Sequence, residues 1–138
     1  MATKVSSDIS TNVNITARKN DSFYLEATLT NEDDTIFNLT SYILTQLEIK
    51  KVSGTLVKKF TNSGNSATET TETLKCATIS TDTTNGIIKI DVPYTTTLTG
   101  GAAFTNMNLL VGSYDYTLKI SSSTELHTVM HGKFKIVD

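Results

Sequence analysis

Apolar residues recur at every second position in several short stretches of this chain, which is the period of a β-strand with one buried face. In the two clearest stretches these positions are Phe23, Leu25, Ala27 and Leu29, and Tyr114, Tyr116, Leu118 and Ile120. Shorter patterns of the same kind predict further strands near residues 13–15, 43–50, 56–60, 74–79, 88–92 and 126–136. About eight short strands are typical of a β-sandwich or barrel.

Turn residues separate these stretches. They lie at residues 31–34, 53–54, 81–86 and 121–124. Asn and Asp favour turns because their side chains bond to the following backbone, and Gly adopts positive φ without steric cost. Threonine, about a fifth of the chain, also suits half-exposed strands. The sequence therefore predicts an all-β fold with antiparallel strands.

The last two strands are predicted to pair as a hairpin across the turn at residues 121–124. In the last strand, even-numbered residues are predicted to face the core. They are Leu126, Thr128, Met130, Phe134 and Ile136. The packed face of the whole domain is predicted to contain Phe23, Leu25, Leu47, Ile49, Ile88, Ile90, Tyr116 and Leu118.

Three polar stretches have little to contribute to a core. Residues 1–12 are predicted to form a flexible N-terminal arm, and residues 13–138 a single domain. Residues 61–73 and 94–108 are predicted to form long loops. Long loops in a compact domain are often functional, so the arm and both loops are candidate contact surfaces.

Composition excludes several classes of protein. The 138 residues suffice for one domain with its own core, and a net charge of −2 gives no electrostatic footprint for nucleic acid or an anionic membrane. The single cysteine, Cys76, cannot form an internal disulfide. The N-terminal residues lack the apolar run of a signal peptide, and no stretch is long enough to span a bilayer. Synthesis in the cytoplasm is therefore expected.

No motif in the chain carries a reaction. The two histidines, His127 and His131, would hold zinc if they lay on a helix, but on a strand they stand roughly 13 Å apart. Both are predicted to face solvent, away from the core. Cys76 has no neighbouring histidine and is interpreted as an inert thiol. Phosphate-binding and nucleophile-elbow motifs are absent from the sequence.

Two further groups of side chains are candidates for ligand binding. Asn31–Asp34 offers oxygen ligands for calcium but lacks the spacing of a calcium loop. The five tyrosines, Tyr24, Tyr42, Tyr94, Tyr114 and Tyr116, are candidates for a sugar-binding floor. Core packing with the hydroxyl at the rim is the favoured interpretation for Tyr114 and Tyr116. No catalytic, cofactor-binding or metal-binding residue is assigned.

Several segments together carry a resemblance to a known family. They are ITARKNDSF at 15–23, NLTSY at 38–42, GSYDYTLKI at 112–120 and GKFKI at 132–136. Over residues 13–137 the chain resembles the immunoglobulin-like β-sandwich domains of tailed-bacteriophage virion proteins, such as baseplate upper proteins and tail or capsid accessory proteins. The resemblance implies an immunoglobulin-like sandwich of seven or eight antiparallel strands.

The resemblance also implies a function. It points to a non-enzymatic structural or accessory protein of the virion, in the tail, the baseplate or a capsid decoration. Such a protein binds other virion proteins, is expected to form homo-oligomers, and needs no cofactor, nucleic acid or membrane. The alternative is a carbohydrate-binding or adhesin-type β-sandwich. A small hydrolase on the same fold is a third hypothesis, for which the sequence offers no site.

Overall fold

The computed structural model describes residues 2–4, 10–19, 21–61, 75–76, 79–92 and 110–138. Within these ranges the chain is almost entirely β-structure, without an α-helix. The strands are β1 (Ala2–Lys4), β2 (Thr11–Asn12), β3 (Ile15–Arg18), β4 (Phe23–Thr30), β5 (Leu44–Lys50), β6 (Leu56–Thr61), β7 (Lys75–Cys76), β8 (Ile79–Asp82), β9 (Ile87–Val92), β10 (Gly112–Ser121) and β11 (Leu126–Val137). In the described part of the chain, no helix is long and apolar enough to cross a membrane.

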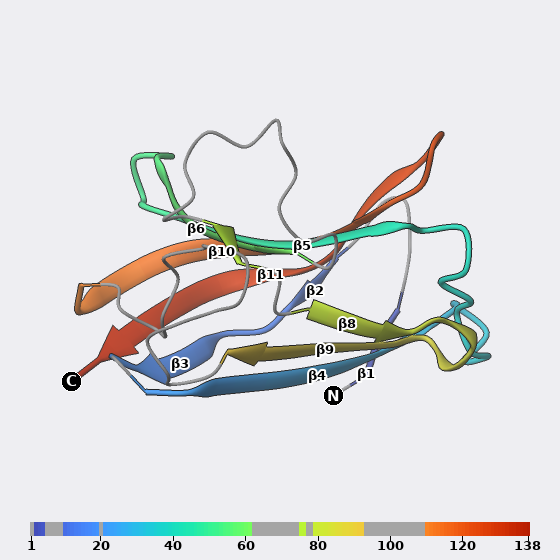
Figure 1. Cartoon of the computed structure of the whole chain (residues 1–138), viewed down its shortest axis with the longest axis horizontal. Coiled ribbons are helices and arrows are strands. Elements are labelled where there is room, and N and C mark those ends of the chain that lie inside the picture. Colours follow the sequence, from blue (N-terminus) through green and yellow to red (C-terminus); the bar gives the residue numbers. More distant parts are fainter. Residues whose placement is uncertain (1, 5–9, 20, 62–74, 77–78, 93–109) are drawn as a thin grey trace.

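The strands form two sheets. The four-stranded sheet has the order β1-β4-β9-β8, and the seven-stranded sheet has the order β2-β11-β10-β5-β6-β7, with β3 also paired to β11. The long neighbours within each sheet are antiparallel, whereas β1, β2, β3 and β7 pair in parallel. In Figure 1, β4, β8 and β9 lie along the lower side of the molecule and β5, β6 and β10 along the upper side. The predicted all-β sandwich is confirmed.

The core lies between the two sheets and follows the predicted alternation. Of the eight residues predicted for the packed face, seven are buried and Leu25 is partly buried. Aromatic rings join the layers, because Phe23 of β4 contacts Phe134 of β11 with ring centroids 5.4 Å apart. Tyr116 contacts the same Phe134 ring edge-on at 6.0 Å. Edge-on pairs of this kind add to the stabilisation from burial alone.

The N-terminal segment differs from the predicted arm. Ala2–Lys4 pairs with Thr28–Thr30 of β4, and Thr11–Asn12 pairs with Met130 and His131 of β11. These two pieces of residues 1–12 are therefore strands of the two sheets. Sequence pattern did not predict them because pairing at a sheet edge uses backbone N–H and C=O groups, which polar residues supply as well as apolar ones. The domain boundary at residue 13 stays a prediction.

The last strand contains an irregularity that the period-two pattern missed. In the β10–β11 pair, Leu118 lies opposite Met130 but Lys119 lies opposite Thr128, so Val129 is an extra residue in β11. Val129 and Met130 are consequently both buried. A β-bulge of this kind reverses the facing of every residue before it. The predicted core positions of Leu126 and Thr128 are wrong, and Leu126 is 64% exposed.

The connection from β4 to β5 is a compact corner built on the backbone. The amide of Leu29 donates to the carbonyl of Gly86 at 2.7 Å, and the amide of Phe37 donates to the carbonyl of Leu29 at 3.1 Å. Gly86 follows a short 3₁₀ helix at Thr83–Asn85 and has φ +65°. The turn predicted at residues 81–86 is confirmed for residues 83–86, where the glycine takes the expected positive φ, whereas Thr81 and Asp82 still belong to β8.

Tyr116 fastens the N-terminal segment to the last strand. It lies opposite Gly132, and its hydroxyl donates a hydrogen bond to the carbonyl oxygen of Val13. The amide of Val13 donates to the carbonyl of His131 at 2.9 Å. A Cβ at position 132 would overlap the Val13 carbonyl, so only glycine lets the two backbones approach this closely. The strand around Tyr116 therefore packs in the core, as the sequence predicts, and also holds the N-terminal segment.

Burial raises the pKa of Tyr116 to about 12, which leads to a pH prediction. An exposed tyrosine ionises near pH 10, so between pH 10 and 12 the folded chain keeps a proton that the unfolded chain has lost. The free energy of unfolding is therefore expected to fall by up to about 1.4 kcal/mol per pH unit in this range, and Tyr116 causes no loss below pH 10.

The measurement is urea unfolding at pH 8 and at several values between pH 10 and 11.5, for the unchanged chain and for Tyr116→Phe. The substitution is expected to lower stability at pH 8 by about 1 kcal/mol, because it removes one hydrogen bond. It is also expected to flatten the alkaline slope. The pKa of Tyr42 is raised as well, so only the difference between the two chains reports on Tyr116. Parallel slopes would contradict the prediction.

Two predicted contact surfaces lie largely outside the described residues. Of the loop predicted at residues 61–73, only Thr61 is described, and it is a buried residue at the end of β6. The loop predicted at residues 94–108 lies wholly outside the described ranges, and so does Tyr94.

Candidate functional site

The turn that joins β10 to β11 holds a network of polar contacts. The predicted turn at residues 121–124 closes with the amide of Ser122 donating to the carbonyl of Glu125 at 2.8 Å. The hydroxyl of Ser122 in turn accepts from the amides of Thr124 at 3.3 Å and Glu125 at 3.0 Å. Serine stabilises such a turn because its short side chain reaches the following backbone. The turn therefore holds Glu125 in a defined position.

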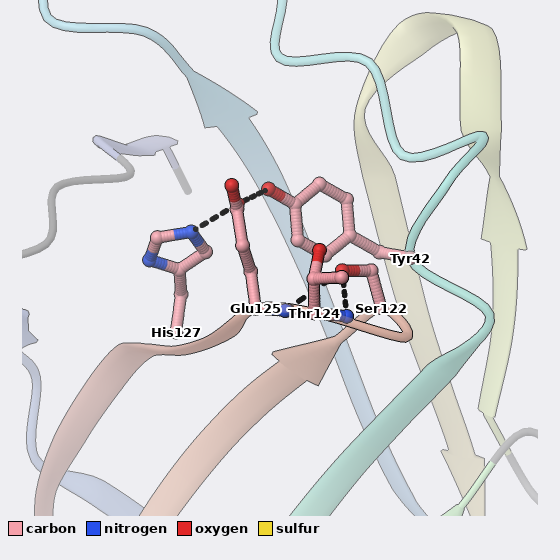
Figure 2. A network of polar contacts seen from close by, with 5 residues as sticks. All are labelled: Tyr42, Ser122, Thr124, Glu125 and His127. Carbon is pink, nitrogen blue, oxygen red and sulfur yellow. Dashed lines mark hydrogen bonds and ion pairs between the residues drawn. The ribbon is translucent and has the colours of Figure 1, made fainter.

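Glu125 bridges two side chains from different parts of the chain. Its carboxylate accepts a hydrogen bond from the hydroxyl of Tyr42 at 2.6 Å and lies 3.1 Å from Nε2 of His127. Figure 2 shows the carboxylate between the two rings. An ionised carboxylate only accepts hydrogen bonds, so Nε2 of His127 carries the proton in this contact. We call Tyr42, Glu125 and His127 the turn triad.

The electrostatics of the turn triad follow from these contacts. The hydrogen bond from Tyr42, and then that from His127, hold the pKa of Glu125 below its usual value. Loss of solvent, and then the bond to Glu125, raise the pKa of Tyr42 to about 12. Tyr42 therefore stays a neutral phenol at physiological pH, and Glu125 stays ionised.

Contacts between aromatic rings connect the turn triad to the corner between β4 and β5. The Tyr42 ring lies 5.8 Å from the His127 ring and 5.2 Å from the Phe37 ring, measured between centroids. Phe37 and Tyr42 belong to the corner between β4 and β5, whereas His127 belongs to β11. The turn triad thus ties the end of the β10–β11 hairpin to that corner, and its first role is to position the turn.

A shallow groove of about 450 Å³ lies beside the turn triad on the outward face of the seven-stranded sheet. Its lining residues are Leu44, Gln46, Lys119, Ser121, Ser122, Thr124, Glu125 and Leu126. Lys119 forms an ion pair with Glu48 at 3.1 Å. The groove thus offers amide, hydroxyl and charged groups around two leucine side chains, a mixture suited to a polar ligand or a protein segment.

One of the two histidines does not lie where the sequence predicts. Both were expected to face solvent. His131, opposite Thr117, lies on the outward face as expected, but the bulge at Val129 sets His127 opposite the buried Ile120. They lie on opposite faces of the sheet, and the side chain of His127 is only 17% exposed. Nδ1 of His131 forms a hydrogen bond with the hydroxyl of Ser10. Each ring therefore has a protein partner of its own.

The remaining candidates lie apart from the turn triad. Cys76 lies in β7 beside Phe60 of β6. In the turn at residues 31–34, the Asp33 carboxylate accepts from the hydroxyl of Thr35 at 2.6 Å and from its amide at 3.2 Å, which lowers the pKa of Asp33. This carboxylate thus closes its own turn. Within the described ranges, no group of three or more His, Cys, Asp and Glu side chains is placed to hold a metal ion.

Four of the five tyrosines are described, and they divide by position. Tyr114 and Tyr116 are buried, and the hydroxyl of Tyr114 donates to the carbonyl of Leu110 at 2.7 Å, so the favoured interpretation of these two as core residues is confirmed. Tyr24 is 58% exposed on the other sheet. Tyr42 belongs to the turn triad. These four rings do not lie together on one surface on which a sugar could stack.

Comparisons with known proteins agree with the fold and identify a solved structure that resembles it. The structure is a two-sheet β-sandwich, and the solved structures that resemble it include one described as the "N-terminal domain of phage TP901-1 ORF48". The match covers 99% of this chain and 97% of that chain, with a TM-score of 0.54 and 10% sequence identity. No protein-family model and no curated protein sequence matches the chain. At this identity the likeness shows a shared fold.

Proposed function

We propose that this chain is a non-enzymatic structural or accessory protein of a tailed-phage virion. In this proposal it belongs to the tail, the baseplate or a capsid decoration, and acts through protein–protein contacts after synthesis in the host cytoplasm. The observation that carries the proposal is the likeness to a phage-protein domain along nearly the whole length of both chains. Because a fold alone does not define function, the surfaces of the chain must supply the rest.

We further infer that the sandwich is immunoglobulin-like, and the strand order supports this. In immunoglobulin sandwiches one sheet has the order A-B-E-D, and the other contains G, F and C followed by C′ and C″. The order β1-β4-β9-β8 corresponds to the first, and β11-β10-β5-β6-β7 corresponds to the second. The parallel pairing of β1 with β4 is a departure from the antiparallel pairing of that fold.

The chemistry of the turn triad supports a non-enzymatic role. A hydrolase built on His127 and Glu125 would need a nucleophile within reach of the imidazole. The hydroxyl that contacts this pair is that of Tyr42, which bonds to the carboxylate and has a pKa of about 12. Its phenol is therefore a poor nucleophile at neutral pH, and its contacts favour a structural tie.

The alternative, a carbohydrate-binding or adhesin-type sandwich, is favoured by the polar groove. Sugar sites usually combine such hydrogen-bonding groups with an aromatic ring on which the sugar stacks. Among the described residues, those that line this groove include no aromatic ring. The proposed partners are therefore other virion proteins and further copies of the chain, without nucleic acid, membrane or cofactor.

The test is quantitative mass spectrometry of gradient-purified particles of the phage that encodes the chain. We expect the chain at a fixed ratio to the major capsid protein, and antibody labelling in electron micrographs at one place on the particle. A chain absent from particles and monomeric in the lysate would overturn the proposal. Binding of the purified chain to host polysaccharides, combined with its absence from particles, would establish the alternative.

A further inference from the structure

Charged side chains are distributed unequally between the two outward faces of the sandwich. On the four-stranded sheet, the outward positions of β4, β8 and β9 carry three acidic side chains and one basic side chain, a net charge of −2. They are Glu26 of β4, Asp82 of β8, and Asp91 and Lys89 of β9. The turn after β4 adds Glu32, Asp33 and Asp34 at the end of this sheet. This side of the molecule is acidic.

The outward face of the seven-stranded sheet has the opposite sign. Its outward positions in β3, β5, β6, β10 and β11 carry six basic and two acidic side chains, a net charge of +4. The basic side chains are Arg18, Lys50, Lys59, Lys119, Lys133 and Lys135, and the acidic ones are Glu48 and Asp115. Ion pairs join Lys119 to Glu48 at 3.1 Å and Lys133 to Asp115 at 2.7 Å, and Arg18 lies 3.8 Å from Asp21 beyond the end of β3.

The alternation of the strands enforces this separation. Side chains of one parity fill the core, so the charged residues named above stand on the outward side of their own sheets. A chain with a net charge of only −2 thus carries two extended faces of opposite sign, directed away from each other. The net charge of the chain, which is close to zero, does not reveal this separation.

We propose that these faces bind each other between copies, with the acidic four-stranded sheet of one copy stacked on the basic seven-stranded sheet of the next. A second copy is the occupant that the charges favour, because each face finds its complement on the same molecule. Contact between like faces would place charges of one sign together, which is unfavourable. The contact is therefore heterologous, and it can extend into a ring or a stack. The inference rests on the proposed assembly into a virion.

The size of the smaller sheet sets the strength of this contact. Four strands about 4.8 Å apart and about six residues long present a face of roughly 400 Å², below the roughly 800 Å² per partner of stable complexes. Association in solution is therefore weak, and it gains strength where an assembly holds many copies together. It also weakens as salt rises, because exposed charges are screened.

The experiment uses sedimentation velocity on the purified full chain over a range of concentrations. Self-association is expected at an ionic strength of about 20 mM, with an association constant about tenfold lower at about 300 mM. One variant removes the basic excess by Lys50→Glu with Lys135→Glu. A second reverses the acidic face by Glu26→Lys with Asp91→Lys. Each variant alone is expected to associate at least about tenfold more weakly than the unchanged chain.

Mixing the two variants provides the decisive measurement. The first variant keeps the acidic face and the second keeps the basic face, so one native contact forms between them. A mixture is expected to give a 1:1 dimer that does not extend further. The matched control is Lys19→Glu with Lys51→Glu, which reverses two lysines in turns and should leave association within about threefold of the unchanged chain. Thermal unfolding of each variant verifies that the fold is retained.

The outcomes separate this inference from the proposed function. A mixture that stays monomeric, or variants that associate as well as the unchanged chain, would overturn the stacking of opposite faces. In either case the presence of the chain in purified particles would still support the virion role. Conversely, a chain that stacks in solution but is absent from particles would retain the contact and refute the virion role.

Discussion

Replacing Gly86 by alanine is expected to lower the free energy of unfolding by about 3–5 kcal/mol. Two effects add. At φ +65° an alanine side chain is conformationally strained, and its Cβ would lie 2.6 Å from the carbonyl oxygen of Phe37 and 2.8 Å from that of Leu29. Both contacts are with backbone atoms of the β4–β5 corner, which cannot rotate away as a side chain would. Urea unfolding at pH 7 measures the loss.

The matched control is Gly54→Ala in the β5–β6 turn. Gly54 also has a positive φ, +98°, but an added Cβ there would have no atom within 4 Å. Its substitution is expected to cause only the conformational part of the loss, about 1–2 kcal/mol. Equal losses at the two positions would show that the corner around Gly86 relaxes, and would contradict the packing described for it.

Truncation of Leu118 to alanine is expected to lower the free energy of unfolding by about 2–5 kcal/mol. Leu118 is fully buried in the middle of β10, opposite Met130 on one side and Leu47 on the other. Removing three carbon atoms there loses the free energy gained by burying them away from water. It also leaves a cavity that the two neighbouring strands cannot fill. Urea unfolding, with the slope of the transition compared between the chains, gives the value.

Leu126→Ala is the control for this second prediction. Leu126 belongs to the same hairpin and satisfies the same alternating pattern in sequence, yet it is 64% exposed. Its truncation is expected to change stability by less than about 0.5 kcal/mol. A larger loss at Leu126 than at Leu118 would indicate that the bulge at Val129 is absent and that β11 has the simple register predicted by the sequence.

The effect of a bulge shows how far a periodic pattern can be trusted. From Met130 to Ile136 the pattern in β11 identifies the buried side chains correctly, but before Val129 it assigns side chains to the wrong face. One extra residue also moves His127 from the outward face to the rim of the core, where it meets Tyr42. The turn triad therefore depends on a single inserted residue.

Several features of this protein were determined by local sequence alone. The alternation in residues 23–30 and 112–121 predicts their buried sides because the period of two is a property of the strand itself. The turns at residues 81–86 and 121–124 follow from Gly, Asn and Ser, whose preferences act within a few residues. The packed face, the all-β class and the burial of Tyr114 and Tyr116 could all be predicted in this way.

Other features were decided only by the tertiary structure, because they depend on pairs that are distant in the chain. Tyr42 and Glu125 are 83 residues apart, and no spacing in the sequence signals their contact. The pairing of Ala2–Lys4 with β4 depends on which sheet edge is open, since backbone groups carry no sequence code. The bulge at Val129 depends on the register that β10 imposes on β11. The separation of charge follows from which sheet each strand joins, and that choice is made only when the two layers pack.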